Sequence, residues 1–147
     1  DSPSPFNYSV TTGTTFDLLE TSSGRVLLSF QAEEERIRRL QRRKFYMKIQ
    51  KGVSKLSNDS LEKKFTSKTI HEIRKNKCEV VKSLQVNGVT NISAPVFDHT
   101  NYAIAAITIP YLQRINKSSK NDINLSKTTK LLKEYSVKLS QSLGYLN

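Results

Sequence analysis

The chain has 147 residues, 36% of them hydrophobic and 25% charged, a balance that suits one compact domain with a buried core. Its formal net charge of +11 suits either a polyanionic partner or high solubility. Cys78 is the only cysteine, which excludes an internal disulfide and a thiolate metal cluster. No stretch reaches the roughly 20 apolar residues of a membrane-spanning helix. We therefore expect residues 1–147 to form one soluble, cytoplasmic domain without a cofactor.

The first elements are predicted to be two helices. Hydroxyl residues at 21–23 precede the apolar run 26–30, which is typical of a helix N-terminus and predicts a short buried helix. A second helix is predicted from Glu33 to about Lys44, with carboxylates at its start, where the helix dipole favours negative charge. Its apolar stripe is narrow, which indicates packing along one edge only.

The middle of the chain is predicted to change from helix to strand. Asp59 and Glu62 have the spacing of a capping box, which predicts one helix from there to 75–76. The segment 78–84 then predicts a strand, and Gly88 marks the turn that ends it.

The strongest β pattern is a hairpin formed by residues 92–97 and 102–109, with turn-forming residues between them. The second of these strands is apolar on both faces, so we expect it to be central and covered by helices on at least one side. Pro95 has no backbone donor, so its own strand is expected to have an edge or a bulge at that point.

The chain is predicted to end in a helix. Ser126 is the expected N-cap, and Gly144 supplies the stop. Apolar residues recur along it at every fourth position: Leu131, Tyr135, Leu139 and Leu143.

A long basic stretch follows the start of the second helix. The twenty residues from Arg36 to Lys55 carry nine basic side chains and no acid, so a polyanion would be attracted there first. The same pattern fits a solvated helix face, because aromatic stacking partners are sparse and no RNA-binding motif is present. Both interpretations stay open.

Nothing in the sequence predicts catalysis or metal binding. His71 and His99 are the only histidines, and neither has the spacing to acids or cysteine that a convincing metal site requires. A nucleophile with a base, paired carboxylates and a phosphate-binding glycine loop are all missing. Cys78 lies in a predicted apolar strand, where a structural thiol is the ordinary case. We therefore expect no enzyme and no metal site.

Several short motifs together resemble the C-terminal, effector-binding domain of IclR-type bacterial transcriptional regulators. Their order and approximate spacing agree over most of the chain, although each motif alone is weak. The motifs are Gly13, Thr21–Arg25, Ile73-Arg74, Gly88-Val89, Ile92–Asp98, Ala105–Ile107 and Leu139–Gly144.

The resemblance implies an α+β, GAF-like fold, in which a curved antiparallel sheet with flanking helices holds a pocket for a small, usually acidic, metabolite. In the family this domain begins with a helix and strands ahead of the Gly13 region, so part of the sheet is missing or shortened here. The resemblance also implies a winged helix-turn-helix domain that reads DNA and is absent from this chain. A homodimer or homotetramer is expected, because such regulators bind DNA as assemblies.

Five residues are predicted to bind the ligand. Ser22 and Ser23 match the family's ligand-contacting loop and lie where a helix N-terminus offers unpaired N–H groups, although such hydroxyls also serve as plain caps. Asn91 and Thr108 match two polar pocket positions, and strand alternation allows both to share a face; each also fits an edge residue satisfied by water. Lys82 stands where the family has acids, and it either favours an anionic ligand or points to solvent.

The leading hypothesis is a domain that senses a small molecule, an organic acid, and controls a linked DNA-binding domain by binding one conformation more tightly. The alternative is an oligomerisation or interaction module with a closed pocket, whose basic stretch 36–55 contacts nucleic acid or an acidic partner. A third hypothesis is a free-standing GAF-like binder without a DNA reader.

Overall fold

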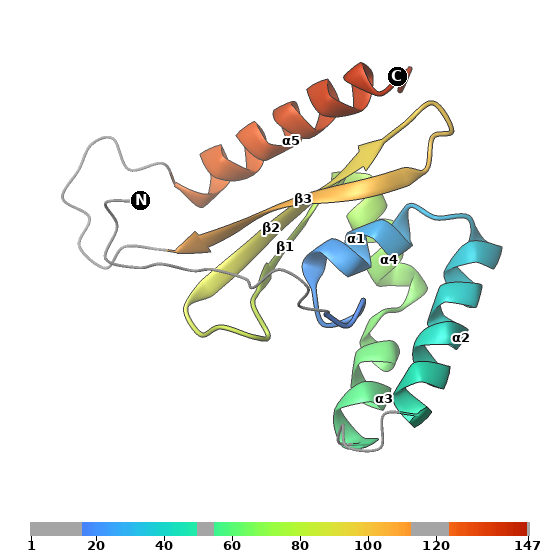
Figure 1. Cartoon of the computed structure of the whole chain (residues 1–147). Coiled ribbons are helices and arrows are strands. Elements are labelled where there is room, and N and C mark those ends of the chain that lie inside the picture. Colours follow the sequence, from blue (N-terminus) through green and yellow to red (C-terminus); the bar gives the residue numbers. More distant parts are fainter. Residues whose placement is uncertain (1–15, 50–54, 113–123, 147) are drawn as a thin grey trace.

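The computed structural model describes residues 16–49, 55–112 and 124–146, with side chains for all of these except 47–49 and 55–59. Gly13 therefore lies outside the described residues. The fold is α+β, as expected: Figure 1 shows α5 on one face of the sheet, α1 on the other, and α2 and α3 extending away from it. The elements in chain order are α1 (Ser22–Ser29), α2 (Glu33–Ile49), α3 (Lys55–Lys64), α4 (Ser67–Asn76), β1 (Glu79–Lys82), β2 (Val89–Phe97), β3 (Ala103–Leu112) and α5 (Leu125–Ser142).

The described sheet has three antiparallel strands in the order β1-β2-β3. The hairpin and the strand before it are thus confirmed. Among the described residues the central strand is β2 and not, as predicted, the second hairpin strand: β3 is the last strand of the described sheet, and its Ile104 and Leu112 are 52% and 47% exposed. Apolar residues on both faces of β3 suggested double burial, but α1 is too short to cover its full length.

Pro95 is accommodated within the central strand. Its partner on β3 is Ala106, and the register shifts one residue later, between Val96 and Phe97. The strand is therefore irregular one residue after the proline, as the prediction of a bulge requires, and the proline does not lie in an edge strand. A shift of this kind follows from the donor that proline lacks.

Strand alternation divides the core into two parts. Ile92 and Ala94 of β2 are fully buried and pack with Cys78 and Leu132 on the α5 face. The residue between them, Ser93, belongs to the opposite, α1 face. The core on that side contains these buried residues: Leu19, Val26, Leu28, Phe65 and Ile73.

The predicted short helix after the hydroxyl residues is confirmed as α1. Thr21 is its N-cap, with an extended backbone and a side chain that accepts a hydrogen bond of 3.1 Å from the Gly24 N–H. Gly24 is required by close packing, because a Cβ atom there would lie 2.1 Å from the Leu18 carbonyl oxygen. The residues before α1 therefore lie directly against its first turn.

The predicted single helix from Asp59 to 75–76 was wrong. Asp59 lies within α3, which ends at Lys64, and a new helix begins after Thr66. Thr66 is extended and its hydroxyl accepts from the Thr69 N–H, so the N-cap lies seven residues later than the capping-box spacing suggested. The break allows Phe65 and Ile73 to enter the same core from different directions.

A buried arginine joins the N-terminal loop to two helices. Arg43 of α2 donates from Nε to both carboxylate oxygens of Asp17, at 2.8 and 2.7 Å, and from Nη1 to Glu62 of α3 at 2.9 Å. Lys44 lies 3.0 Å from the second oxygen of Glu62. Asp17 also accepts the Leu19 N–H at 2.7 Å, so the same carboxylate fixes the approach to α1.

The last helix starts earlier than predicted. Its N-cap is Asn124 instead of Ser126, because the Asn124 side chain accepts from the Lys127 N–H at 2.8 Å. Gly144 has a φ of 86°, which confirms it as the stop. The residues that face the sheet are Leu132, Ser136 and Ser140. No helix in the described ranges is long and apolar enough to span a bilayer.

Candidate functional site

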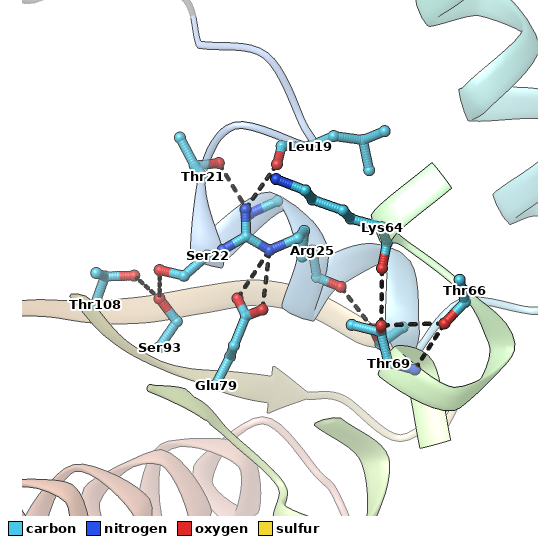
Figure 2. A network of polar contacts seen from close by, with 12 residues as sticks. Leu19, Thr21, Ser22, Arg25, Lys64, Thr66, Thr69, Glu79, Ser93 and Thr108 are labelled. Atoms are coloured by element: carbon cyan, nitrogen blue, oxygen red, sulfur yellow. Dashed lines mark hydrogen bonds and ion pairs between the residues drawn. The ribbon is translucent and has the colours of Figure 1, made fainter. Parts of the chain in front are cut away.

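A chain of three hydroxyl groups joins α1 to the sheet. The Ser22 hydroxyl lies 2.6 Å from the Ser93 hydroxyl, which in turn lies 2.7 Å from the hydroxyl of Thr108 (Figure 2). Ser22 and Ser93 are buried, whereas Thr108 is exposed on β3. The contact between the strands is set by register, because Ser93 and Thr108 are directly paired. This hydroxyl chain therefore runs from the N-terminus of α1 to an exposed position on β3.

The three hydroxyl groups together carry one hydrogen more than their two mutual contacts require. Each hydroxyl has one donor hydrogen, and the two contacts consume two of the three hydrogens. When the two contacts run in one direction, the remaining hydrogen lies at one end, at Thr108 or at Ser22; when Ser22 and Thr108 both donate to Ser93, it lies on Ser93. An acceptor placed at Thr108 would orient all three groups in the same direction, since linked hydrogen bonds polarise one another.

Two backbone donors lie at the buried end of the chain. The first N–H groups of a helix have no intrahelical acceptors. In α1 the Gly24 N–H is taken by the Thr21 side chain, and the Arg25 N–H is bonded to the Thr21 carbonyl. No acceptor within the described residues takes the N–H groups of Ser22 and Ser23, which lie at the positive end of the helix dipole.

The structure brings three of the predicted residues to one face. Asn91 lies two positions before Ser93 on β2, so both belong to the α1 face together with Thr108. Asn91 is half-buried, and no side-chain hydrogen bond links it to another described residue. Ser22 meets this face from α1.

The other two predicted residues lie differently. Lys82 shares its face of β1 with Val80, the α5 side, and is exposed there. It is therefore on the opposite side of the sheet from Thr108. Ser23 follows Ser22 in α1 and is half-buried, and its side chain makes no hydrogen bond within the described residues.

An ion pair that the sequence analysis missed lies beside the hydroxyl chain. Arg25 of α1 donates from Nε to both oxygens of Glu79, at 2.9 and 3.1 Å, and from Nη1 to the Leu19 carbonyl at 2.6 Å (Figure 2). Glu79 is paired in register with Ser93. Burial raises the pKa of the Glu79 carboxyl, and the Arg25 guanidinium opposes that rise. The sequence feature that could have indicated this pair is Glu79, a single acidic residue at the start of an apolar strand.

Part of the basic stretch is neutralised within the chain: four of its nine basic residues pair with three carboxylates. Arg38 and Arg39 both bind the carboxylate of Glu35, while Arg43 and Lys44 form the network with Asp17 and Glu62 described above. Residues 50–54 of the stretch lie outside the described residues. The described part thus offers less free positive charge than the sequence suggests.

A groove of about 580 Å³ lies on the other side of the sheet. It is lined by Val80 of β1 and by residues of the first half of α5, from Leu125 to Glu134. Its position differs from the hydroxyl chain, which opens on the α1 face. Among the described residues no group of acids, histidines and cysteine is placed to hold a metal ion.

Solved structures with the same fold are bacterial transcriptional regulators. IclR of Thermotoga maritima is 24% identical with a TM-score of 0.63, over 99% of this chain and 54% of that one. An IclR-type regulator of Alicyclobacillus acidocaldarius is 19% identical with a TM-score of 0.68, over 97% and 52%. The C-terminal domain of Escherichia coli KdgR is 22% identical with a TM-score of 0.60, over 87% and 71%.

The chain thus spans about half the length of the full regulators it matches. No curated protein sequence is similar enough to match it. The family defined as the bacterial transcriptional regulator IclR C-terminal domain, however, matches residues 2–141. The chain therefore belongs to the IclR family of bacterial transcriptional regulators and represents their C-terminal domain.

Proposed function

We propose that this domain senses a small organic acid on the α1 face of its sheet, at the hydroxyl chain of Ser22, Ser93 and Thr108. The observation that carries the proposal is the continuous contact of these hydroxyls from a helix N-terminus to an exposed strand position. Membership of the IclR family supports a regulatory function. The net charge of +11 adds a general attraction for anions.

The ligand carboxylate is held by neutral donors in this proposal. One carboxylate oxygen accepts the hydrogen that Thr108 has available, and Asn91 on the same face supplies a side-chain amide. Hydrogen bonds to an ionised acceptor are about twice as strong as those between neutral groups. Ala106 and Pro110, the alternate residues on either side of Thr108, present apolar surface to the body of the ligand.

The bound state is transmitted through the residues that fix α1. A ligand that orders the hydroxyl chain also fixes the first turn of α1 relative to β2. Asp17, which lies just before that turn, accepts hydrogen bonds from the Leu19 N–H and from Arg43 of α2, and Arg43 also donates to Glu62 of α3. The positions of α2 and α3 therefore depend on the position of the turn. In a longer regulator this change in population is passed to a linked DNA-binding domain.

Titration calorimetry with lactate, succinate and benzoate, each beside its neutral amide, tests the proposal. At least one acid is expected to bind, and its amide to bind much more weakly, because the site recognises charge. Thr108→Val removes the exposed donor with little change in shape and is expected to abolish binding. Lys82→Ala is the control, because Lys82 lies on the opposite face and its loss leaves the affinity unchanged.

Two results would contradict the proposal. One is binding that Thr108→Val leaves intact and Lys82→Ala abolishes, which would place the ligand on the α5 face. The other is the absence of binding by every acid, with unfolding temperatures unmoved by the ligands, since a ligand of the folded state must raise them. The second result would favour the alternative of an interaction module without an effector.

A further inference from the structure

The groove of about 580 Å³ between β1 and the first half of α5 has the size of a ligand site. It forms because α5 packs on the neighbouring strand: Leu132 is buried against Ile92 and Ala94 of β2, while β1 lies at the end of the described sheet. Val80 on β1 therefore stays 41% exposed on this face. Small-molecule pockets typically measure about 300–1,000 Å³, so the groove has room for one small ligand.

Two apolar side chains line the groove, one from each element. Val80 belongs to β1, and Leu125 belongs to the first turn of α5, where it also packs against the buried cluster beneath the helix. Removing apolar surface from water stabilises a complex, roughly in proportion to the area covered. A ligand of this groove is therefore expected to have an apolar part that covers both residues.

The positive charges at the groove are not neutralised by the chain. Lys130 and Lys133 line it, and no carboxylate of the described residues pairs with either of them. On α2, by contrast, four basic residues bind carboxylates. Glu134 is the one acid in the lining, and it is the last lining residue along α5. The charge of the groove thus favours an anion.

Lys133 lies closer to the core than Lys130. It is half-buried, whereas Lys130 is exposed. Burial raises the pKa of the Cys78 thiol, and the charge of Lys133 opposes this rise, which requires its ammonium group to lie near the residue that precedes β1. Water and salt screen a charge less beside apolar surface than in open solution. A carboxylate is therefore expected to bind at Lys133, with Lys130 as its second partner.

The length of the groove selects among anions. Its lining on α5 extends from Leu125 to Glu134, which is about 13 Å at the helical rise of about 1.5 Å per residue. An extended carboxylic acid of about eight to ten carbons comes close to this length, because its carbon–carbon bonds are about 1.5 Å long. Acids as short as lactate, succinate and benzoate do not reach from Leu125 to Lys133. The chemistry and the length together fit an alkyl chain with one terminal carboxylate.

We propose that the groove between β1 and α5 is a second ligand site, which binds a free medium-chain fatty acid with its carboxylate at Lys130 and Lys133 and its alkyl chain over Val80 and Leu125. The site is independent of the effector site proposed above, because Thr108 lies on the opposite face of the sheet.

A two-dimensional amide NMR titration of the 147-residue chain with octanoate, below the concentration at which it forms micelles, tests the site. Saturable shifts are expected at the amides of Val80, Leu125, Thr129 and Lys133. Acetate keeps the carboxylate but lacks the chain, and octanol keeps the chain but lacks the charge. Each of the two is expected to bind roughly tenfold more weakly or less, because each loses one of the two contributions.

Variants separate the groove from the rest of the surface. The double variant Lys130→Gln, Lys133→Gln keeps side chains of similar kind without charge and is expected to weaken octanoate binding roughly tenfold. Lys138→Gln is the matched control, because Lys138 lies on the same helix with its ammonium group over the Tyr135 ring and does not line the groove. It should bind octanoate like the wild type, and so should Thr108→Val.

Val80→Asp gives an independent readout. It places a negative charge at an exposed position of the groove and is expected to abolish octanoate binding, while circular dichroism confirms that the variant is folded. Three results would each overturn the assignment. They are the absence of saturable shifts with octanoate, an affinity that the double lysine variant leaves unchanged, and shifts centred on Ser22 and Thr108, which would place the fatty acid at the effector site.

Discussion

The hydroxyl of Ser22, in the first turn of α1, lies 2.6 Å from the hydroxyl of Ser93 in the central strand, a contact between residues 71 positions apart. Both side chains are buried, so neither hydroxyl can exchange this partner for water without moving its element. The position of the helix N-terminus is thus coupled to the face of the sheet on which Thr108 lies.

Ser93→Ala tests this coupling in the absence of ligand. The substitution removes both hydroxyl contacts and leaves the buried Ser22 hydroxyl without its partner, which costs about 1–3 kcal/mol of unfolding free energy. Thr108→Val is the control, because Ser93 keeps its contact with Ser22 and no buried hydroxyl loses its last partner. Urea unfolding measures both. Equal stability of Ser93→Ala and the wild type would show that the contact does not hold α1 in place.

Gly24→Ala tests the close packing before α1. The added Cβ would lie 2.1 Å from the Leu18 carbonyl oxygen, which is backbone and cannot rotate away. The expected loss is about 3 kcal/mol, at the upper end of overpacking effects. Ser23→Ala, one residue earlier and half-buried, should cost much less. Thermal unfolding that ranks the two variants in the opposite order would contradict the described approach of the loop to the helix.

Arg43→Ala tests the link from Asp17 to Glu62. Removing the buried guanidinium leaves the Asp17 carboxylate without its ion-pair partner, and breaking a buried pair in this way costs about 3–5 kcal/mol. Arg42→Ala is the matched control, because the neighbouring arginine is exposed. Chemical unfolding should show a large loss for Arg43→Ala alone. Similar stability of the two variants would mean that the network does not hold α2 and α3.

Glu79 makes the stability depend on pH. Burial raises the pKa of its carboxyl above the ordinary value of 4.5, with Arg25 opposing the rise, so folding favours the protonated form. The stability from this group is present below the unfolded pKa and is lost as the pH rises through the folded pKa. Glu79→Gln removes the titration.

The stability of the wild type relative to Glu79→Gln is therefore expected to increase as the pH falls from about 7 to about 5. Glu72→Gln, at an exposed position of α4, is the control and should show no such trend. Urea unfolding at several pH values measures the difference. A relative stability of the wild type that decreases toward acid would mean that Arg25 outweighs the burial of Glu79.

The elements that could be predicted from sequence are those with local chemical markers. The hydroxyls before α1, the glycines at 88 and 144, and the alternating hairpin all act through nearby backbone geometry. The boundary between α3 and α4 could not be predicted in this way. There the chain turns because Phe65 and Ile73 share a core with α1, which is a long-range requirement.

The candidate site was predicted in part for the same reason. Ser22, Asn91 and Thr108 meet on one face because strand alternation and a helix N-terminus follow from the sequence pattern. Ser93, the residue that joins two of them, was missed because a serine in an apolar strand has no pattern of its own. The pairing of Arg25 with Glu79 spans 54 residues and depends on packing of α1 against β1.

The most direct test is a two-dimensional amide NMR titration of the labelled chain with whichever of lactate, succinate or benzoate binds most tightly. We predict saturable shifts centred on the amides of Ser22, Ser23, Asn91 and Thr108, with the amides of Lys82 and of α5 unaffected. Shifts confined to the groove between β1 and α5, or none with any of the acids, would contradict an effector site on the α1 face.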